Sequence, residues 1–499
     1  MATSPFRKIL IANRGEIAIR VMRACRELGI TAVTVYSEAD RASKHVRYAD
    51  EAYEIGPPPS TESYLRIDRI IDVAKISGCQ AIHPGYGFLA ENPELPKACE
   101  AEGIIFIGPD SKAMALVGDK TQARRTVEAA GIPIIPGIKE PIEDLKKASE
   151  VATRLGYPIL LKAAGGGGGK GMRVVEKEEE LKSSFERAQS EAESAFGNPA
   201  IYIEKFLIQP RHIEIQILAD HHGNIIHLNE RECSIQRRYQ KLIEESPSPI
   251  VDPDLREKMG EAAKRAIRAS GYTNAGTVEF LVDQKKNFYF LEVNARLQVE
   301  HPVTELVTGV DLVKEQIRIA AGEPLRYAQD DIGLKGAAIE CRISAEDPET
   351  FLPSTGKITE MIEPAGPGVR VESGIYEGYE VPVYYDPLIA KVITWGRDRK
   401  EALSRMVRAL EEYRIKGIKT TIPFHKRILN YPPFIEGNYH TQTITEVEPS
   451  MENHHIEIGA VAATIVAMAE TRISIQKARP GINPWKLSGR VNGLRGSGW

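Results

Sequence analysis

Cysteine and long apolar runs are scarce in this chain of 499 residues. The five cysteines are Cys25, Cys79, Cys99, Cys233 and Cys341. They are odd in number, scattered and without a Cys-x-x-Cys pair, which argues against a disulfide framework or zinc site and predicts reduced thiols in the cytoplasm. The longest late apolar stretch, Gly459 to Ala469, is far shorter than the roughly 20 residues that span a bilayer. No long apolar run precedes Arg14, so we expect neither a membrane span nor a secretory signal.

The chain also lacks an excess of charge and a dinucleotide-binding fingerprint. Its net charge of −4 gives no overall attraction to nucleic acid or to a membrane surface. The segment after the first predicted strand reads Asn13-Arg14-Gly15-Glu16, not Gly-x-Gly-x-x-Gly. A length of 499 residues favours about three domains.

Strand and helix signals alternate over the first hundred residues. Expected strands are Lys8–Ala12, Thr31–Tyr36, Ala81–His83 and Ile104–Ile107, and expected helices are Glu16–Leu28 and Tyr64–Ala74. This order predicts a parallel sheet covered by helices.

The rest of the chain mixes helices with strands. Helices are predicted over Ser111–Ala130, Leu145–Leu155, Leu255–Ala269, Val310–Ala321, Arg399–Tyr413 and Ile456–Lys477, and strands over Pro158–Ala163, Met172–Val175 and Tyr202–Leu207. The Pro-rich segment Gly131–Pro141 is a predicted boundary, and short strands dominate from Gly336 to Thr394.

Residues 292–300 alternate strictly between polar and apolar side chains. The polar positions are Glu292, Asn294, Arg296, Gln298 and Glu300. This period of two predicts an extended strand with one packed and one presented face. A solvated strand face is the ordinary alternative, but carboxylates and amides bind hard cations and guanidinium binds oxyanions, so we expect a site.

A predicted hairpin brings a second carboxylate to this strand. Folding about the turn Asp283–Asn287 places Glu279 opposite Glu292 within one residue of register. Two facing carboxylates repel unless a divalent cation lies between them. With Asn294 as a third oxygen ligand, the set suits Mg²⁺ carried with ATP.

Five consecutive glycines, Gly165 to Gly169, lie between two predicted strands and are followed by Lys170-Gly171. They fail the Walker A pattern, so we expect the tip of a hairpin that covers phosphates, with a flexible linker as the alternative. Lys162 lies in an apolar strand beside this loop and either reaches solvent or binds a phosphate. His212 and the basic run from Gln236 to Lys241 supply further donors, although the run alone is typical of a solvated face.

Together these segments carry a resemblance. The matching stretches are IANRGEIAIR, AIHPGYGFLAEN, FIGP, MALVGDK, GGGGGKGM, EKFL, PRHIEIQ, ERECSIQRR, QVEHPVTE and ECRISAEDP. From Arg7 to about His440 the chain resembles the biotin carboxylase component of biotin-dependent carboxylases, a member of the ATP-grasp superfamily.

The resemblance implies an α/β and α+β fold. Its expected parts are a Rossmann-like N-terminal domain (1–115), an ATP-grasp domain (116–333) with a Gly-rich lid (about 134–206), a mixed α/β C-terminal domain (334–445) and a C-terminal extension (446–499). It also implies a homodimer.

The resemblance further implies an ATP-dependent ligase that carboxylates biotin with bicarbonate through carboxyphosphate. The nucleotide-binding residues implied are Lys120, Lys162, Gly168, Gly169, Glu204, Lys205, Phe206, Leu207, His212, Gln236, Tyr239, Glu279 and Glu292. Glu279, Glu292 and Asn294 would hold Mg²⁺ or Mn²⁺. Lys241, Arg296, Gln298 and Val299 would bind bicarbonate, and Glu300 would deprotonate it. Arg342 would stabilise the biotin enolate beside Tyr86.

Three features depart from the resemblance or extend it. Tyr239 stands where the family usually has His, which leaves its contact with ATP open. Ala295 replaces Thr or Pro and predicts a packing change only. The tail beyond residue 450 carries the predicted helix Ile456–Lys477, which either packs on its own domain or docks a partner subunit.

The chain has no Met-Lys pair, so biotin is expected on a separate carrier protein, with a separate carboxyltransferase as a further partner. The final acceptor stays open among acetyl-CoA, propionyl-CoA, pyruvate and 2-oxoglutarate. Two alternatives stay open for the function: another ATP-grasp ligase, such as a carbamoyl-phosphate or amino-acid ligase, and a non-catalytic structural subunit.

Overall fold

The computed structural model describes residues 6–138, 140–163, 172–196 and 199–447. These residues belong to one compact unit, Met1–Val447. The predicted phosphate-covering loop, with its closing glycines Gly168 and Gly169, and the predicted tail helix Ile456–Lys477 lie outside the described residues. Within the described part of the chain, no helix combines the length and apolarity needed to cross a membrane.

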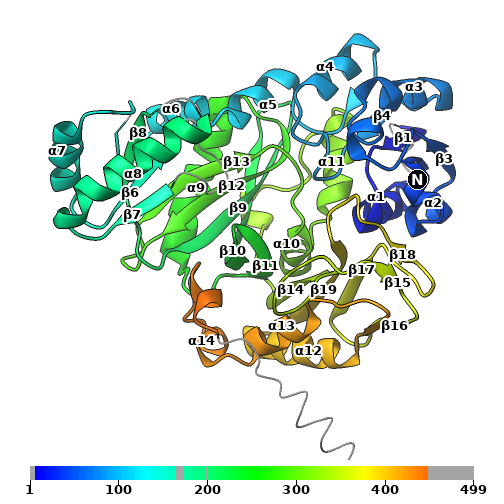
Figure 1. Cartoon of the computed structure of the whole chain (residues 1–499). Helices are drawn as coiled ribbons and strands as arrows, with labels where there is room; N and C mark the ends of the chain where they lie inside the picture. The colour runs from blue at the N-terminus through cyan, green and yellow to red at the C-terminus, as the bar shows by residue number, and fades with distance from the viewer. Residues whose placement is uncertain (1–5, 139, 164–171, 197–198, 448–499) are drawn as a thin grey trace, which may run out of the picture. The chain divides into compact units, whose positions relative to one another are not determined.

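A parallel sheet forms the N-terminal part (Figure 1). Its strand order is β3-β2-β1-β4-β5. Its strands are β1 (Lys8–Ile11), β2 (Thr31–Tyr36), β3 (Glu51–Glu54), β4 (Ala81–His83) and β5 (Ile105–Phe106). Its helices are α1 (Gly15–Glu27), α2 (Lys44–Tyr48), α3 (Ile67–Ser77) and α4 (Glu94–Ala101). Ile9 and Leu10 point to opposite faces and both are fully buried, as expected when helices cover both faces of a parallel sheet. The predicted parallel sheet is confirmed.

A small antiparallel sheet, in the order β7-β6-β8, carries two helices on one face. Its strands are β6 (Ile159–Ala163), β7 (Met172–Val175) and β8 (Ile201–Lys205), and its helices are α7 (Leu145–Leu155) and α8 (Glu178–Phe196). Along β6, Ile159, Leu161 and Ala163 are buried against the helices. Lys162 therefore points to the other face.

The largest sheet has eight antiparallel strands in the order β13-β12-β9-β10-β11-β14-β19-β17. These are β9 (Arg211–Ala219), β10 (Ile225–Arg237), β11 (Gln240–Ser246), β12 (Asn274–Val282), β13 (Phe288–Asn294), β14 (Ala337–Ser344), β17 (Val369–Ser373) and β19 (Leu388–Gly396). Helix α9 (Pro253–Ser270) packs on the apolar side of β9, where Ile213, Ile215 and Ile217 are fully buried. Helix α10 (His301–Thr308) packs on β10, β11, β14 and β19.

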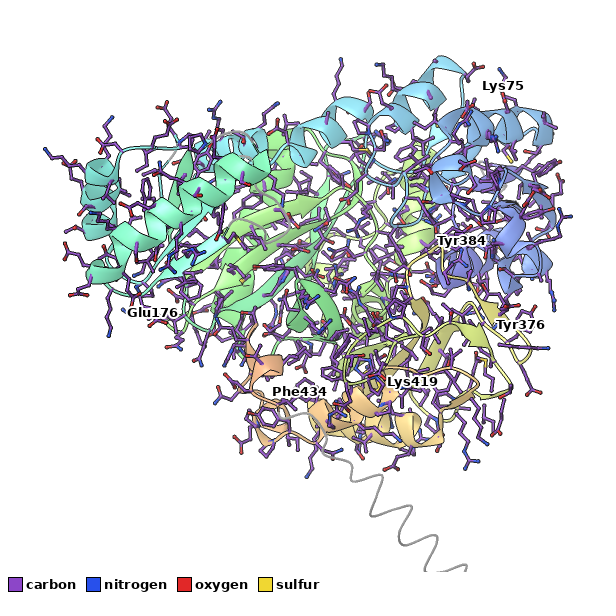
Figure 2. All side chains as sticks on the ribbon, in the orientation of Figure 1. Lys75, Glu176, Tyr376, Tyr384, Lys419 and Phe434 are labelled. Atoms are coloured by element: carbon purple, nitrogen blue, oxygen red, sulfur yellow. The ribbon has the colours of Figure 1, made fainter. Side chains whose placement is uncertain are left out.

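The remaining elements complete the first 447 residues. They are α5 (Ser111–Gly118), α6 (Lys120–Ala129), α11 (Leu312–Ala320), α12 (Arg399–Glu412), α13 (Ile422–Leu429), α14 (Pro432–Ile435) and the short pairs β15 (Gly356–Lys357) with β18 (Glu380–Val381) and β16 (Glu360–Ile362) with β20 (Arg414–Lys416). Phe434 of α14, labelled in Figure 2, packs on Tyr439 with ring centroids 5.0 Å apart. The predicted helix over Ser111–Ala130 is broken at Asp119, which ends α5 and caps α6.

The predicted strand over residues 292–300 is wrong beyond Asn294. β13 ends there, the next residues are irregular, and Glu300 is the N-cap of α10. Pro302 lies in the first turn of α10, where proline favours a helix start and disfavours a continuing strand. Gln298 and Glu300 are 2% and 1% exposed, so their side chains face the interior and not solvent.

Candidate functional site

Polar side chains form a line across the large sheet, on the side opposite to α9. In β9, His212, Glu214 and Gln216 alternate with the three core isoleucines. The strand therefore presents imidazole, carboxylate and amide groups on one face. All three side chains are buried, so their partners must come from the protein or from a ligand.

Lys241 of β11 lies at the centre of this line. Its Nζ is 2.5 Å from Glu214 Oε2, 2.8 Å from Glu279 Oε1 and 2.7 Å from Glu300 Oε1. Burial lowers the pKa of Lys241, but the three carboxylates outweigh burial and raise it well above the usual value. Lys241 is therefore a cation throughout the physiological pH range.

Glu300 is held between two cations. Its Oε2 is 2.9 Å from Arg342 Nη2, while its Oε1 faces Lys241. Burial raises the pKa of Glu300, but Lys241, Arg342 and Arg231 together lower it well below the usual carboxyl range. The structure thus brings Glu300, Lys241 and Arg342 together, in the ionised state that accepts a proton.

Arg231 of β10 is a member of the site that sequence reasoning missed. It is completely buried and donates to Glu214, to Gln216 Oε1 at 2.6 Å and to Gln298 Oε1 at 2.7 Å. Its contact with Thr304 Oγ1 at 3.1 Å ties α10 to the sheet. Alternation along this strand gave no usable signal, because the register of β10 shifts between Glu232 and Gln236.

Glu279 of β12 has three polar partners besides Lys241. Its Oε1 accepts from Asn294 Nδ2 at 2.9 Å and Gln298 Nε2 at 3.0 Å, and its Oε2 is 2.9 Å from His212 Nε2. Burial raises the pKa of Glu279, yet Lys241 and His212 reverse the sign and lower it well below normal. Burial likewise lowers the pKa of His212, and Glu279 outweighs it so that the net shift is upward.

The predicted pairing of Glu279 with Glu292 across the hairpin is confirmed. Glu279 and Glu292 are direct register partners on β12 and β13. Glu292 lies nearer the surface, where its Oε2 is 3.0 Å from Lys120 Nζ. Each of the two carboxylates thus forms an ion pair with a lysine ammonium group.

Two other groups of metal-binding side chains lie close together. They are His212, Glu214 and Glu279, and Glu214, Cys233 and Glu300. Both contain Glu214, which is already paired with Arg231 and Lys241. The oxygen-only set of Glu279, Glu292 and Asn294 fits Mg²⁺ or Mn²⁺ better, because these ions prefer oxygen ligands.

Arg296 lies at the rim of the site. Its Nε is 3.1 Å from Glu91 Oε2, and its Nη2 donates to Asn294 Oδ1 at 3.1 Å. The backbone N–H of Ala295 donates to Glu91 Oε1 at 3.2 Å. Glu91 therefore contacts both the backbone of the irregular segment after β13 and the guanidinium of Arg296.

The small sheet places the other predicted nucleotide-binding residues. Lys162 Nζ forms an ion pair with Glu204 Oε2, and Arg124 Nη1 lies 2.5 Å from Glu204 Oε1. Lys205 Nζ donates to the carbonyls of Gly156 at 2.9 Å and Tyr157 at 3.0 Å. The amino group of Lys205 is therefore engaged within its own sheet. Phe206 and Leu207 follow β8 and are partly exposed.

Gln236 and Tyr239 differ sharply in position. Gln236 Nε2 lies 3.3 Å from His212 Nδ1 within the buried line. Tyr239 is 66% exposed at the turn between β10 and β11, where Arg238 and Tyr239 have φ of +49° and +68°. Positive φ at both central residues is the mark of a type I′ turn, so the turn displays the phenol ring outward.

Tyr86 approaches the other end of the line from the parallel sheet. It follows β4, and its hydroxyl donates to Glu16 Oε1 at 2.5 Å. Lys391 Nζ of β19 lies 5.7 Å from the Tyr86 ring centroid and donates to the Val299 carbonyl at 2.8 Å. The Val299 carbonyl is therefore already engaged by Lys391.

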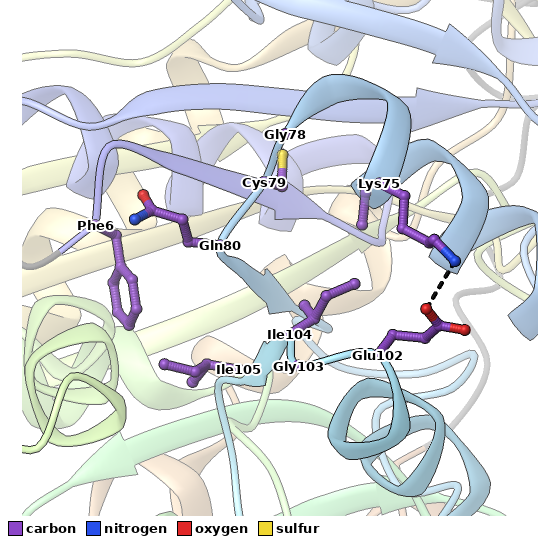
Figure 3. Close-up of a pocket in the computed structure, with 10 residues that line it drawn as sticks. Phe6, Lys75, Gly78, Cys79, Gln80, Glu102, Gly103, Ile104 and Ile105 are labelled. Atoms are coloured by element: carbon purple, nitrogen blue, oxygen red, sulfur yellow. Dashed lines mark hydrogen bonds and ion pairs between the residues drawn. The ribbon is translucent and has the colours of Figure 1, made fainter.

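A cavity of about 560 Å³ lies elsewhere, at the amino-terminal ends of the parallel strands (Figure 3). Its lining includes Phe6, Gln80 and Ile105, and the Lys75–Glu102 ion pair of 2.7 Å lies beside it. Ligands of such sheets bind at the carboxyl ends of the strands, where Tyr86 lies. This cavity is thus separate from the line of polar side chains.

Comparison with known proteins agrees with this geometry. Family models for the biotin carboxylase N-terminal domain, the carbamoyl-phosphate synthase L chain ATP binding domain and the biotin carboxylase C-terminal domain match residues 5–114, 119–328 and 340–446. A pyruvate carboxylase subunit of Methanothermobacter thermautotrophicus is 59% identical over 442 residues, which are 88% of this chain and 90% of that protein. Biotin carboxylase 1 of Bacillus subtilis is 55% identical over 438 residues, which are 87% and 97% of the two chains.

Solved structures are similar over the same region. The biotin carboxylase domain of a thermophilic 2-oxoglutarate carboxylase bound to bicarbonate has a TM-score of 0.85 at 49% identity, covering 88% of this chain and 98% of that one. A biotin carboxylase–beta-gamma-ATP complex from Campylobacter jejuni has a TM-score of 0.82 at 49% identity, covering 88% and 99%. The chain belongs to the biotin carboxylase family.

Proposed function

We propose that this protein is the biotin carboxylase component of a biotin-dependent carboxylase, which uses ATP and bicarbonate to carboxylate biotin on a separate carrier. The observation that carries the proposal is the ionised Glu300 held between Lys241 and Arg342. A carboxylate base between two cations suits the deprotonation of a small oxyanion and the binding of its product.

Bicarbonate would bind beside Glu300 through Lys241, Arg296, Gln298 and the N–H of Val299. Glu300 would then take the bicarbonate proton. A bound oxyanion that draws Lys241 toward itself removes one of the charges that lower the pKa of Glu300. The carboxylate thereby becomes a stronger base when its substrate is present.

The nucleotide would lie between the small sheet and the β12–β13 hairpin. Lys120, Lys162, Gly168 and Gly169 would contact its phosphates, and residues 204–207 with His212, Gln236 and Tyr239 would line the rest. Glu279, Glu292 and Asn294 would hold Mg²⁺ or Mn²⁺, with the ammonium groups of Lys241 and Lys120 marking where positive charge is needed. When bound, the ion offsets the negative charge of the phosphates.

Biotin would meet Arg342 and Tyr86. The geometry supports this because Arg342 shares Glu300 with Lys241, which puts the biotin and bicarbonate groups on adjacent sides of one carboxylate. A biotin carrier protein, a carboxyltransferase and a second copy of this chain are the partners that the family implies, and the cytoplasm is the proposed location.

The decisive assay measures ADP release with Mg-ATP and bicarbonate, with and without free biotin at high concentration. We expect ATP hydrolysis that requires bicarbonate and rises with biotin. The matching ATP-binding domain model of carbamoyl-phosphate synthase keeps another ATP-grasp ligase as the second candidate. Hydrolysis that biotin never stimulates would favour that ligase, and failure to bind Mg-ATP in calorimetry would favour a structural subunit.

The tail from residue 450 is proposed to dock a partner subunit. A chain ending at residue 449 should keep biotin-stimulated ATP hydrolysis but no longer co-purify with carrier or carboxyltransferase subunits. Unchanged co-purification would contradict this role.

A further inference from the structure

Two buried glutamates stand opposite each other behind Arg342. Glu244 of β11 and Glu340 of β14 are direct register partners, and both are 0% exposed. Side chains directly opposite in an antiparallel pair have Cβ atoms about 4.5–5.5 Å apart. Two ionised carboxylates on such neighbouring side chains in the interior would repel each other.

Two cations lie near this pair. Lys391 forms its ion pair with another glutamate, and Arg342 contacts only one oxygen of Glu244. Arg342 Nε lies 2.5 Å from Glu244 Oε1. Lys391 Nζ lies 2.7 Å from Glu372 Oε2 and donates to the Val299 carbonyl. Within the described residues, no donor reaches Glu244 Oε2 or either oxygen of Glu340.

The surroundings of Glu340 also disfavour a charge. On its other side its register partner is Ile393, which packs with Val303 and Val307 of α10 in a small apolar cluster. An ionised carboxylate in such a place is costly unless it is paired and hydrogen-bonded. A neutral carboxylic acid needs only one acceptor for its O–H, and Glu244 Oε2 is available.

Burial raises the pKa of Glu340 well above its usual value, against the opposing effect of Lys391. Burial also raises the pKa of Glu244, against the opposing effect of Arg342. The charged or titratable groups around the pair are Arg342, Lys391, Glu372, Glu300, Lys241, Cys233, Cys341 and Tyr86. The balance of these groups leaves room for one negative charge on the pair.

We propose that Glu244 and Glu340 form an acid–carboxylate pair that shares one proton and positions Arg342 for the biotin reaction. The Glu340 O–H donates to Glu244 Oε2, and Glu244 Oε1 accepts from Arg342 Nε. Glu244 and Glu340 act through Arg342 and are positioning residues. The role of Arg342 toward biotin rests on the proposed function, whereas the shared proton does not.

The shared proton has a consequence for the charge of Arg342. With both glutamates ionised, three carboxylates including Glu300 would surround one guanidinium and weaken its attraction for an anionic oxygen. With one proton held, Glu244 fixes the Nε edge and Glu300 takes Nη2. Nη1 has no hydrogen-bond partner among the described residues and can face the substrate.

Infrared difference spectroscopy tests the proton without turnover. The spectrum of the wild-type protein minus that of Glu340→Gln at neutral pH should contain the C=O stretch of a protonated carboxylic acid. Glu315→Gln is the matched control, because Glu315 is also a buried carboxyl group whose pKa burial raises, but it pairs with Arg318 on α11. The spectrum of the wild-type protein minus that of Glu315→Gln should lack the Glu340 band, because both proteins keep that protonated group. Absence of any protonated-carboxyl band from the wild-type spectrum, or its persistence in Glu340→Gln, would overturn the shared proton.

Steady-state kinetics test the positioning role. Glu340→Gln keeps a donor toward Glu244 and should retain biotin-stimulated turnover within about threefold. Glu244→Gln weakens a charge-assisted hydrogen bond to Arg342 and should lower kcat/KM for biotin by about ten- to a hundredfold. The KM for ATP should stay unchanged in both variants, as in Glu315→Gln.

If Glu244→Gln leaves kcat/KM for biotin unchanged, or changes the KM for ATP equally, the pair does not position Arg342. A wild-type chain without biotin-stimulated activity would refute the proposed function but leave the infrared result standing.

Discussion

At the scale of single residues, the site is balanced by charges within the protein itself. Lys241 faces three carboxylates and Arg231 lies beneath it without solvent contact. Removing one member of such a network leaves another charge buried without a partner, which costs more than the loss of a surface ion pair. Conservative substitutions are therefore the informative ones.

Glu300→Gln keeps the shape of the side chain but removes its ability to accept a proton. Bicarbonate-dependent ATP hydrolysis should fall about 10²- to 10⁴-fold, the usual contribution of a general base. Binding of Mg-ATP in calorimetry should persist, because Glu300 does not contact Lys120, Lys162 or Glu292. Turnover at the wild-type rate would show that another group takes the proton.

Tyr239→His should have only a mild effect. The side chain is largely exposed, and histidine tolerates positive φ better than tyrosine. One neutral hydrogen bond is worth about 0.5–1.5 kcal/mol, so the dissociation constant for ATP should change by about tenfold or less. Tyr239→Asn is the control, because asparagine also tolerates the positive φ of this turn but has no aromatic ring. Complete loss of activity in Tyr239→His would mean that the residue does more than line the nucleotide site.

At the scale of elements, one capping residue sets the position of a predicted phosphate ligand. Asp119 accepts from the N–H groups of Thr121 and Gln122 at 2.9 Å and 3.0 Å and starts α6 at Lys120. Asp119→Ala should destabilise this helix start by about 1 kcal/mol and raise the KM for ATP. Asp119→Asn keeps a cap and should stay close to wild type in both thermal unfolding and KM. Equal KM values for ATP in the two variants would show that the Asp119 cap does not affect ATP binding.

The elements also explain what the sequence could and could not predict. The Glu279–Glu292 pairing was predictable because a short turn and two apolar strands fix the register of a hairpin. The segment after Asn294 was not, because its alternation arises from an irregular chain that is packed on both sides, and only Pro302 signalled the helix start. The contacts of Arg231 with β9, β12 and α10 join residues far apart in sequence, which local patterns do not encode.

At the scale of the whole molecule, buried histidines link stability to pH. Burial lowers the pKa of His45, His227 and His425 to about 4 and that of His83 to about 3, from 6.5. Above pH 6.5 both folded and unfolded chains carry these rings neutral. As the pH falls below that value only the unfolded chain takes up the protons, so stability is lost between about pH 6.5 and 4, by at most ~1.4 kcal/mol per pH unit for each ring.

Urea unfolding midpoints between pH 7.5 and 5 measure this loss. His45→Gln should reduce the pH dependence, because it removes a ring whose pKa burial lowers to about 4. His222→Gln, at an exposed position, is the control for the substitution itself. If the urea midpoint changes equally with pH in the wild type and in His45→Gln, His45 does not contribute to the pH dependence of stability.

The eight-stranded sheet runs without a break through the predicted boundary at residues 333 and 334, since β11 on one side pairs with β14 on the other. Expression of either half alone would expose a full row of unpaired backbone groups along a central strand. Such an edge is a template for pairing with other chains. Separate fragments should therefore aggregate. Two fragments should restore the folded protein only if they are made together, so that β11 pairs with β14 before either fragment pairs with a second copy of itself.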